Sequence, residues 1–290
     1  MTNRSEAVVP RCIVSIHAHP DDEASKGAGT VHRYHQAGVR TVLVCCTGGE
    51  AGDILNPALD TPEVRGRLPE VRLEELARSA EIIGYDEVVM LGYRDSGMPD
   101  SAENADPGCF ARAPLDEAVG RLVAILRRER PQVVLTYGDD QSGYPHPDHL
   151  QVHDVTMAAV PAAADPDRYP EAGEPWAVAK VYWSVWSRVR LQATHQAFLD
   201  AGLESPYSEE WFDRASQDHR ITTSIDVDGL YAVKSAALRA HATQVDPTSP
   251  FWFGLPEDVA QSIHPFEDYI RATSTVDAPQ PETDLFAGLS

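Results

Sequence analysis

Four short apolar segments alternate with helical patterns through the first half of the chain, and this order limits the fold more than any other feature. The segments are rich in β-branched residues, as strands covered on both faces should be, and span residues 12–18, 41–46, 86–91 and 132–137. Apolar side chains recur every three or four positions over residues 25–37, 68–83 and 114–130, which predicts helices. The alternation predicts an α/β fold with a Rossmann-like, doubly wound, mostly parallel sheet.

The second half of the chain has a weaker pattern. We expect a strand near 179–186, a helix near 188–202, and a strand followed by a helix over 221–243. This pattern predicts a metal-binding catalytic core over residues 1–165. Residues 166–290 would then form an α+β cap that completes the pocket, with a soft boundary inside one compact domain.

The formal net charge of −21 argues against nucleic acid or an anionic membrane as a partner, because such partners require clustered lysine and arginine. No stretch of the sequence approaches the roughly 20 apolar residues that span a bilayer. With too short an apolar run for a signal peptide as well, the chain is expected in the cytoplasm. The four cysteines form no CxxC pair, which favours reduced thiols. A small molecule is therefore the expected partner.

Polar segments follow all four predicted strands. In chain order they contain HPDDE, TGGEAGDILNP, GYRDSGMPD and GDDQSGYPHPDH. Because ligands of such sheets bind beyond the carboxyl ends of the strands, we expect one shared site. The first strand is not followed by GxGxxG, and TGGEAG lacks the spacing of a phosphate-binding loop, so a dinucleotide cofactor is disfavoured.

Two of these segments carry histidine and aspartate at a spacing that suits a metal ion. His19 and Asp22 are three residues apart with an aspartate between them, and His146 and His149 repeat this arrangement. Catalytic zinc takes three nitrogen and oxygen ligands and keeps one position for water, which predicts Zn²⁺ on His19, Asp22 and His149. Fe²⁺ is the alternative metal. Helix capping explains one HxxD pair equally well, but not two such segments at two strand ends.

The neighbouring side chains then have predicted catalytic roles. Asp21 is placed to accept a proton from water as general base. His146, restrained by Asp148, would protonate a leaving amine or bind the oxyanion of a tetrahedral intermediate. Tyr144 is a further candidate for that oxyanion.

Two more histidines are not expected to bind the metal. His17 alternates away from His19 along its strand, which predicts a packed, hydrogen-bonded side chain. His153 lies one helical turn after His149, where a supporting or surface position is expected.

HPDDE after a first strand, together with a later HPDH, resembles the LmbE and PIG-L family of zinc-dependent N-deacetylases and amidases, whose members have a Rossmann-like fold. The resemblance implies the same ligands and the same base and acid residues as the spacing does. The segments HAHPDDEASKGAGT, RAHATQVDP and ETDLFAGL extend it over nearly the whole chain, to the mycothiol branch of the family. Amidases of mycothiol S-conjugates and deacetylases of N-acetylglucosaminyl inositol both belong to this branch.

The resemblance also implies residues that bind substrate. Lys26 stands where the amidases carry lysine, which suggests a contact with the cysteinyl or thioether-linked part of the substrate. A cation in the first turn of a helix opposes the helix dipole, so another interaction should compensate it. Glu50, Arg72 and Asp95 match positions that hold inositol and glucosamine hydroxyls, and His241 in HATQ is expected to line the pocket.

The sequence therefore predicts a zinc-dependent amidase, a hydrolase of a linear amide C–N bond. Its substrate would be a mycothiol S-conjugate, and its products glucosaminyl inositol and an S-conjugated N-acetylcysteine, in detoxification or natural-product biosynthesis. The alternative is deacetylation of N-acetylglucosaminyl inositol by the same machinery. A sugar-binding protein without turnover is a third interpretation.

Overall fold

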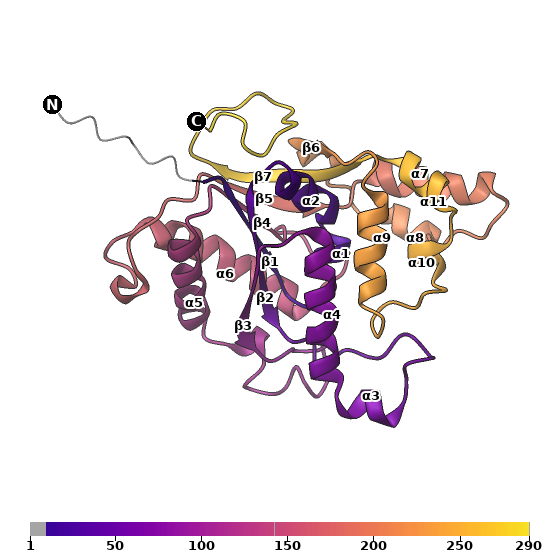
Figure 1. Ribbon diagram of the computed structural model, residues 1–290, viewed down its shortest axis with the longest axis horizontal. Helices are drawn as coiled ribbons and strands as arrows, with labels where there is room; N and C mark the ends of the chain where they lie inside the picture. Colours follow the sequence, from indigo (N-terminus) through magenta and orange to yellow (C-terminus); the bar gives the residue numbers. More distant parts are fainter. Residues whose placement is uncertain (1–9, 142, 290) are drawn as a thin grey trace.

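The structure, a computed structural model, describes residues 10–141 and 143–289. Within them, one sheet has the strand order β3-β2-β1-β4-β5-β7-β6 (Figure 1). The strands are β1 (Cys12–His17), β2 (Arg40–Thr47), β3 (Glu87–Tyr93), β4 (Val133–Thr136), β5 (Lys180–Val185), β6 (Thr223–Asp226) and β7 (Phe266–Ser274). β1 to β5 are parallel in the 3-2-1-4-5 order of doubly wound sheets, and β7 and β6 add an antiparallel edge. The predicted fold class is confirmed.

Helices cover both faces of the sheet (Figure 1). One face carries α2 (Ala28–Gln36), α4 (Leu68–Ile83) and α9 (Tyr231–Ala240), and the other carries α5 (Leu115–Glu129) and α6 (Pro147–Ala164). The remaining helices are α1 (Asp22–Ser25), α3 (Pro62–Gly66), α7 (Arg188–Asp200), α8 (Glu209–Asp213), α10 (Pro250–Phe253) and α11 (Glu257–Ile263), with 3-10 turns η1 (Phe110–Arg112), η2 (Pro170–Ala172) and η3 (Asp218–Arg220). None of the described helices combines the length and the apolar character needed to cross a bilayer.

The central strands show why their sequences are continuously apolar. Successive side chains of a strand point to opposite faces of the sheet. Val14, Ile16 and Val44 therefore pack in the core beneath α5 and α6, whereas Ile13 and Leu43 pack in the core beneath α2 and α4. All five are buried, so both faces of these strands meet apolar neighbours.

The predicted helix over 25–37 is two helices. α1 ends at Ser25, and Gly27 has φ of +93° before α2 begins. Glycine adopts this conformation at little cost, and it breaks the helix. Lys26 consequently lies at the C-terminal end of α1, where a cation is favourable to the helix dipole. The prediction that Lys26 opposes the dipole at a helix N-terminus is therefore wrong.

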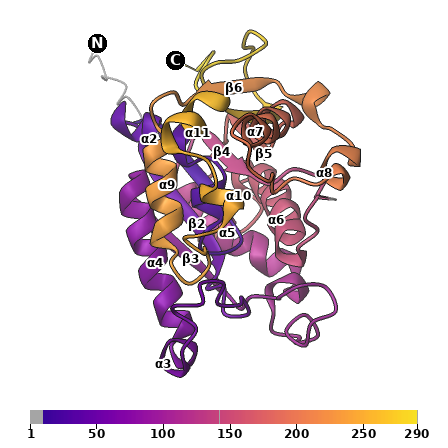
Figure 2. The ribbon, with the colours of Figure 1, turned by 90° about the vertical axis from the view of Figure 1, so that its right-hand side faces the viewer.

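The soft boundary expected at residue 165 falls just after α6, but the sheet continues across it. β5 pairs with β4 in parallel, and β7 pairs with β5 in antiparallel fashion. The helices α7 to α11 from the C-terminal part lie grouped on one side of the sheet (Figure 2).

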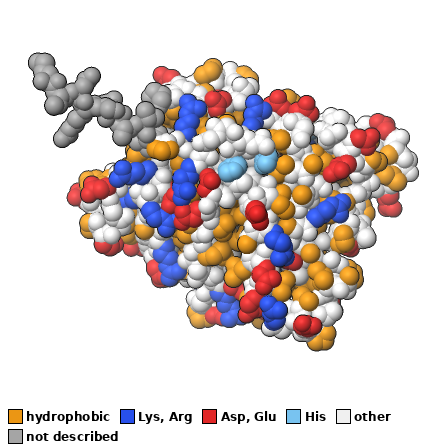
Figure 3. All heavy atoms as spheres, viewed as in Figure 1, with side chains coloured by type: hydrophobic (Ala, Val, Ile, Leu, Met, Phe, Trp, Pro, Cys, Tyr) orange, Lys and Arg blue, Asp and Glu red, His pale blue; other side chains and the backbone are white. Residues whose placement is uncertain are grey.

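On the face seen in Figure 3, basic and acidic side chains are interspersed.

A buried carboxylate fixes the C-terminal tail to the sheet. Glu282 accepts hydrogen bonds from Lys180 Nζ at 2.8 Å, Tyr182 Oη at 2.7 Å, Thr223 Oγ1 at 3.0 Å and Arg271 Nη1 at 2.6 Å. Burial by itself would raise the pKa of Glu282, but these donors hold it below its ordinary value. The tail is thereby joined to β5, β6 and β7 at one point.

We predict that Glu282→Gln lowers the free energy of unfolding by about 3 kcal/mol, because it leaves the Lys180 charge buried without its counter-ion. The folded pKa of Glu282 is depressed, so its contribution is present above its unfolded pKa and is lost as the pH falls through the folded value. Urea unfolding should therefore show the largest difference from wild type at neutral pH and a smaller one in acid. Exposed Glu171→Gln is the control, and equal stabilities of Glu282→Gln and wild type at neutral pH would contradict the prediction.

Candidate active site

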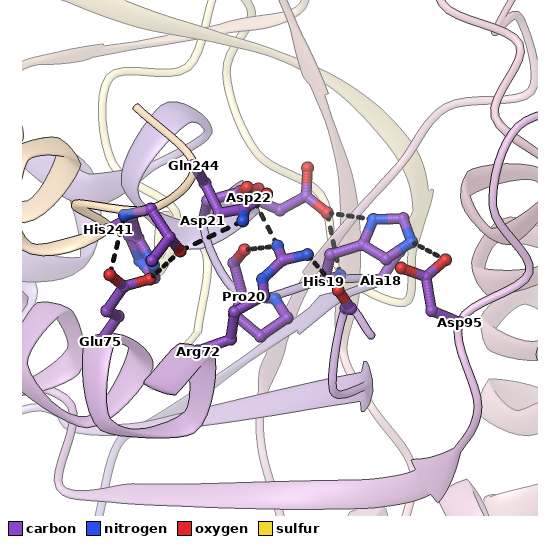
Figure 4. Close-up of polar contacts among 12 residues, drawn as sticks. Ala18, His19, Pro20, Asp21, Asp22, Arg72, Glu75, Asp95, His241 and Gln244 are labelled. Carbon is purple, nitrogen blue, oxygen red and sulfur yellow. Dashed lines mark hydrogen bonds and ion pairs between the residues drawn. The ribbon is translucent and has the colours of Figure 1, made fainter. Parts of the chain in front are cut away.

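The segments after β1, β3 and β4 meet at the carboxyl edge of the sheet, around the imidazole of His19. Asp22 Oδ2 lies 3.4 Å from His19 Nδ1 and 3.4 Å from His149 Nε2. The three side chains are buried, and one possible ligand atom from each lies within 4.8 Å of the others. Figure 4 shows the His19 ring between the carboxylates of Asp22 and Asp95. The structure thus brings together the three ligands predicted from the sequence.

The chemistry of these groups fits a divalent metal ion. Two imidazoles and one carboxylate are nitrogen and oxygen donors that zinc and iron(II) accept. The second ring nitrogen of His19, Nε2, is 3.1 Å from Asp148 Oδ2. A carboxylate behind a histidine is the usual arrangement that orients a metal-binding imidazole. Asp148 is itself held by the backbone N–H of Ser96 at 3.0 Å and by the Ser96 hydroxyl.

A second group of possible ligands, His19, Asp95 and His146, also has donor atoms within 4.8 Å of one another. It uses the opposite side of the His19 ring, because Asp95 Oδ1 is 3.5 Å from Nε2. That nitrogen already faces Asp148, and Asp95 is occupied by the backbone N–H groups of Gly97 and Ala51. These contacts make the group with Asp22 and His149 the better metal site.

Asp148 holds the His146 ring through its backbone N–H and not through its carboxylate. Its oxygens face His19 and Ser96, and only its backbone N–H reaches His146, donating to Nδ1 at 3.2 Å. The reason is local: His146 is the N-cap of α6, and its ring takes the place of a capping side chain. Because Nδ1 accepts this bond, the proton of a neutral His146 ring lies on Nε2.

Asp21 has a backbone conformation that is rare outside glycine. Its φ is +114°, and its N–H donates to Glu23 Oε2 at 2.9 Å. The Asp21 carboxylate lines the cavity and lies 3.3 Å from Arg72 Nη2. Burial raises the pKa of Asp21 to about 6, although Arg72 acts in the opposite direction. Strained backbone of this kind concentrates at functional sites.

Arg72 holds the site together rather than standing on the surface. Only 2% of it is exposed, and its guanidinium donates to the carbonyls of Gly49 and Pro20 as well as contacting Asp21 (Figure 4). The segments that follow β1 and β2 are therefore fixed to α4 through one side chain. Arg72 also lines the cavity, so a substrate hydroxyl remains within its reach there.

Asp95, Glu50 and His241 differ in their access to the cavity. Asp95 lines it, whereas exposed Glu50 accepts the backbone N–H of Asp95 at 3.1 Å and is not part of the lining. His241 is fully buried, with Nε2 2.6 Å from Glu23 Oε1. It lies behind the cavity lining, where it supports Glu23 and, through Glu23, Asp21. The sequence interpretation expected His241 to line the cavity, and it does not.

Lys26 and Tyr144 both line the cavity. Lys26 Nζ is 2.6 Å from Asp22 Oδ1, so the ammonium compensates the carboxylate oxygen that faces away from the imidazoles. Tyr144 is 55% exposed, and its ring lies 5.4 Å from that of His149 and 6.0 Å from that of His146. Both side chains can reach a ligand beside the metal site.

The two histidines not expected to bind metal are placed as follows. His17 is packed against Tyr137, as predicted, but neither of its ring nitrogens has a hydrogen-bond partner in the part of the chain that the structure describes. The expected hydrogen bond is therefore wrong. His153 lies behind the site, with Nδ1 3.1 Å from the carbonyl oxygen of Tyr137.

A cavity of about 730 Å³ opens over these residues and has two chemically different ends. Towards β2 and β3 it is lined by polar groups that include Arg72 and Asp95. Beyond β5 it is lined by four aromatic side chains from the turn between β5 and α7, from α8 and from α10: Trp186, Trp211, Phe251 and Trp252. Their rings touch, with centroids 4.8 Å apart for Phe251 and Trp252 and 5.8 Å apart for Trp186 and Phe251. We call these four residues the aromatic wall.

The sequence interpretation missed the aromatic wall. Its members are separated by up to 66 positions, from 186 to 252, in the part of the chain with the weakest periodicity. The one available signal was the FWF run at residues 251–253, which is an unusual concentration of aromatic residues beside a turn.

Comparisons with known proteins find relatives over nearly the whole chain. Residues 14–160 match the family model PIG-L, GlcNAc-PI de-N-acetylase. The chain is 43% identical to the mycothiol S-conjugate amidase of Streptomyces coelicolor, over 96% of this chain and 97% of that protein. It is 41% identical to the 1D-myo-inositol 2-acetamido-2-deoxy-alpha-D-glucopyranoside deacetylase of Streptomyces avermitilis, over 97% of this chain and 98% of that protein. The solved N,N'-diacetylchitobiose deacetylase from Pyrococcus horikoshii has the same fold, with a TM-score of 0.61 and 18% identity over 90% of this chain and 83% of that one.

We predict that His149→Ala abolishes tight metal binding, because it removes one of three ligands. Asp148→Asn should weaken the metal affinity about tenfold to a hundredfold, since it replaces the carboxylate that orients His19. Metal content after dialysis and zinc titration by calorimetry would measure both effects. His153→Ala, on the same helix as His149, is the matched control and should keep its metal. Full metal content in His149→Ala would place the ion elsewhere.

Proposed function

Because the chain belongs to the PIG-L family, we propose that it is a metal-dependent hydrolase of an amide C–N bond and that its substrate is a mycothiol S-conjugate. Water would cleave the amide between glucosaminyl inositol and the S-substituted N-acetylcysteine. The reaction would take place in the cytoplasm and would serve either detoxification or the synthesis of a natural product.

The aromatic end of the cavity is the observation that favours a mycothiol S-conjugate over an acetylated sugar as the substrate. An acetyl group needs room for one methyl group beside the scissile carbonyl, whereas this cavity of about 730 Å³ continues past the metal site to the aromatic wall. Partly exposed aromatic rings suit an apolar ligand, because its burial removes apolar surface from water. In a mycothiol S-conjugate the S-linked group lies on the acyl side of the amide, and the sugar and inositol lie on the other side. The two ends of the cavity match these two halves.

The residues of the site have distinct parts in this hydrolysis. His19, Asp22 and His149 would hold the ion, which when bound lowers the pKa of water and polarises a carbonyl oxygen. Asp21 would take the proton of the water that adds to the carbonyl carbon, with its carboxylate held in place by Arg72.

His146 would act through Nε2, the ring nitrogen that carries the proton. It would donate a hydrogen bond to the carbonyl oxygen as negative charge develops there, and Tyr144 on the cavity wall would be a second donor. When the C–N bond breaks, the amine nitrogen would receive the proton that Asp21 took from water or the one on His146.

The second candidate function is deacetylation of N-acetylglucosaminyl inositol. The similarity to deacetylases of this substrate favours it. It would use the same ligands, base and polar end of the cavity, but it would leave the aromatic wall without a function. We therefore rank it below the amidase.

We predict that one zinc-loaded preparation hydrolyses S-benzyl mycothiol with a kcat/KM at least about tenfold above that for N-acetylglucosaminyl inositol, because only the first substrate buries apolar surface on the aromatic wall. Amine release would be measured for both substrates under the same conditions. Zinc and iron(II) would be compared as the added metal. A higher kcat/KM for the acetylated sugar would reverse the ranking.

We predict that Asp21→Asn lowers kcat about a hundredfold to ten-thousandfold while the metal content stays near that of the wild type, because asparagine cannot act as the base. Asparagine tolerates the positive φ of this position better than alanine does, so the backbone should keep its course. Exposed Asp53→Asn is the control. Loss of the metal together with activity would make Asp21 a ligand.

A further inference from the structure

A second, smaller cavity adjoins the aromatic end of the large one. It has a volume of about 120 Å³, and Trp186, Phe251 and Trp252 line both cavities. Two cationic side chains line only the small cavity: Arg190 from α7 and Lys234 from α9. Because the two cavities share these three lining residues, the compartment with positive charge lies directly beside the aromatic end of the large cavity.

Lys234 is buried without a charged partner. Its exposed fraction is 9%, and across residues 10–141 and 143–289 its ammonium makes no hydrogen bond and no ion pair. The ammonium lies over the ring of Trp186, with Nζ 6.0 Å from the ring centroid. Arg190 also lies over Trp186, at 5.4 Å, and within the same residues its guanidinium has no ion pair. A buried ammonium without a counter-ion is destabilising, so this arrangement calls for another explanation than stability.

The acidic group on the wall of the small cavity is already engaged. Glu267 accepts the backbone N–H groups of Gly29 at 3.2 Å and Thr30 at 2.8 Å, at the start of α2, and the Tyr269 hydroxyl at 3.4 Å. His264, which also lines the cavity, pairs with Asp268 at 2.9 Å. Glu267 therefore stabilises a helix N-terminus and leaves Lys234 without a direct salt bridge.

The charges that line the small cavity interact electrostatically with those that line the catalytic cavity. Burial, the charge of Arg190 and the charge of Lys26 all lower the pKa of Lys234, to about 7, while Glu267 acts in the opposite direction. Lys26 belongs to the lining of the catalytic cavity, so the two cavities are close enough for their charges to interact. An anion beside Lys234 would offset both the burial and the repulsion by the other cations.

We propose that Lys234 and Arg190 bind a carboxylate at the far end of the substrate's S-linked group, and that the aromatic wall binds a planar apolar part of the same group. The inference rests on the proposed function, because it assumes that the acyl half of the conjugate occupies the aromatic end. The volume of about 120 Å³ suits a small anionic group. The negative charge of Glu267 on its wall favours a monoanion over a phosphate dianion.

The test compares two conjugates that differ by one carboxylate: S-benzyl mycothiol and S-(4-carboxybenzyl) mycothiol. The readout is the ratio of kcat/KM for the carboxylated conjugate to that for the plain one. Wild type should give a ratio above one, and Lys234→Met should lower the ratio about tenfold or more through KM, as expected when a charge-assisted hydrogen bond is lost. Arg190→Gln should lower it in the same direction.

The controls separate a ligand contact from a structural effect. Arg239→Met removes an exposed cation from the same helix as Lys234 and should leave the ratio unchanged. Lys234→Met should also unfold at a higher temperature than wild type, because it removes an unpaired buried charge. Equal ratios in wild type and Lys234→Met, or a wild-type ratio of one or below, would overturn the proposal.

A binding experiment separates failure of this inference from failure of the proposed function. If neither conjugate is hydrolysed, the function is wrong, and the site is tested by tryptophan fluorescence with S-(4-carboxybenzyl)-N-acetylcysteine and its S-benzyl analogue. Tighter binding of the carboxylated ligand by wild type, but not by Lys234→Met, would support the site. Equal binding of the two ligands would overturn the inference. It would also be overturned if both conjugates were hydrolysed equally well while acetate stabilised wild type but not Lys234→Met, because the site would then bind a free carboxylate and not the substrate.

Discussion

The arrangement of charge around His19 is the constraint on which the rest of the site depends. Asp22, Asp95 and Asp148 are all buried and all approach this one imidazole. Buried carboxylates are tolerated only where positive charge and hydrogen bonds compensate them. The protein supplies Lys26 on Asp22 and backbone N–H groups on the other two, and a divalent ion between Asp22 and the imidazoles would supply the remainder. Because these groups come from the ends of β1, β3 and β4, the compensation also joins three parts of the chain.

The position of Asp21, the proposed base, depends on a residue from the far end of the chain. Asp21 holds its positive φ because Glu23 accepts its N–H, and Glu23 is itself held by Ser79 and by His241, 218 positions away. The C-terminal part of the chain therefore does more than cover the pocket. It fixes the backbone beside the metal ligands through α9, which packs against α2 and α4. This dependence gives a physical reason why the sheet and the C-terminal helices form one unit around the site.

The sequence was sufficient where chemistry and local spacing coincide. Strands covered on both faces have largely apolar sequences, and HxxD and HPDH follow two of them, so the sheet and the convergence of His19, Asp22 and His149 could be predicted. Spacing could not show which imidazole a carboxylate faces across the site, and so the contact of the Asp148 carboxylate with His19 was not predicted. The pairing of His241 with Glu23 and the convergence of Trp186 with Phe251 depend on long-range packing, which no local pattern records. Gly27 itself indicated a break in the helix, but the apolar periodicity on both sides of it favoured one continuous helix, which was the prediction made.

The division of the cavity explains why the metal motif by itself does not identify the substrate. The proposed ligands and the proposed base lie at the ends of β1 and β4, where they would act on the amide. The polar end towards β2 and β3 would take the polyol that the two candidate substrates share. These parts are needed for either reaction, so relatives with either activity can share them. Among the described residues, the four of the aromatic wall make no hydrogen bond, ion pair or ring contact with His19, Asp22 or His149, so they could differ without loss of the chemistry. Specificity for the acyl half should therefore be decided by the aromatic wall and by the charged compartment behind it.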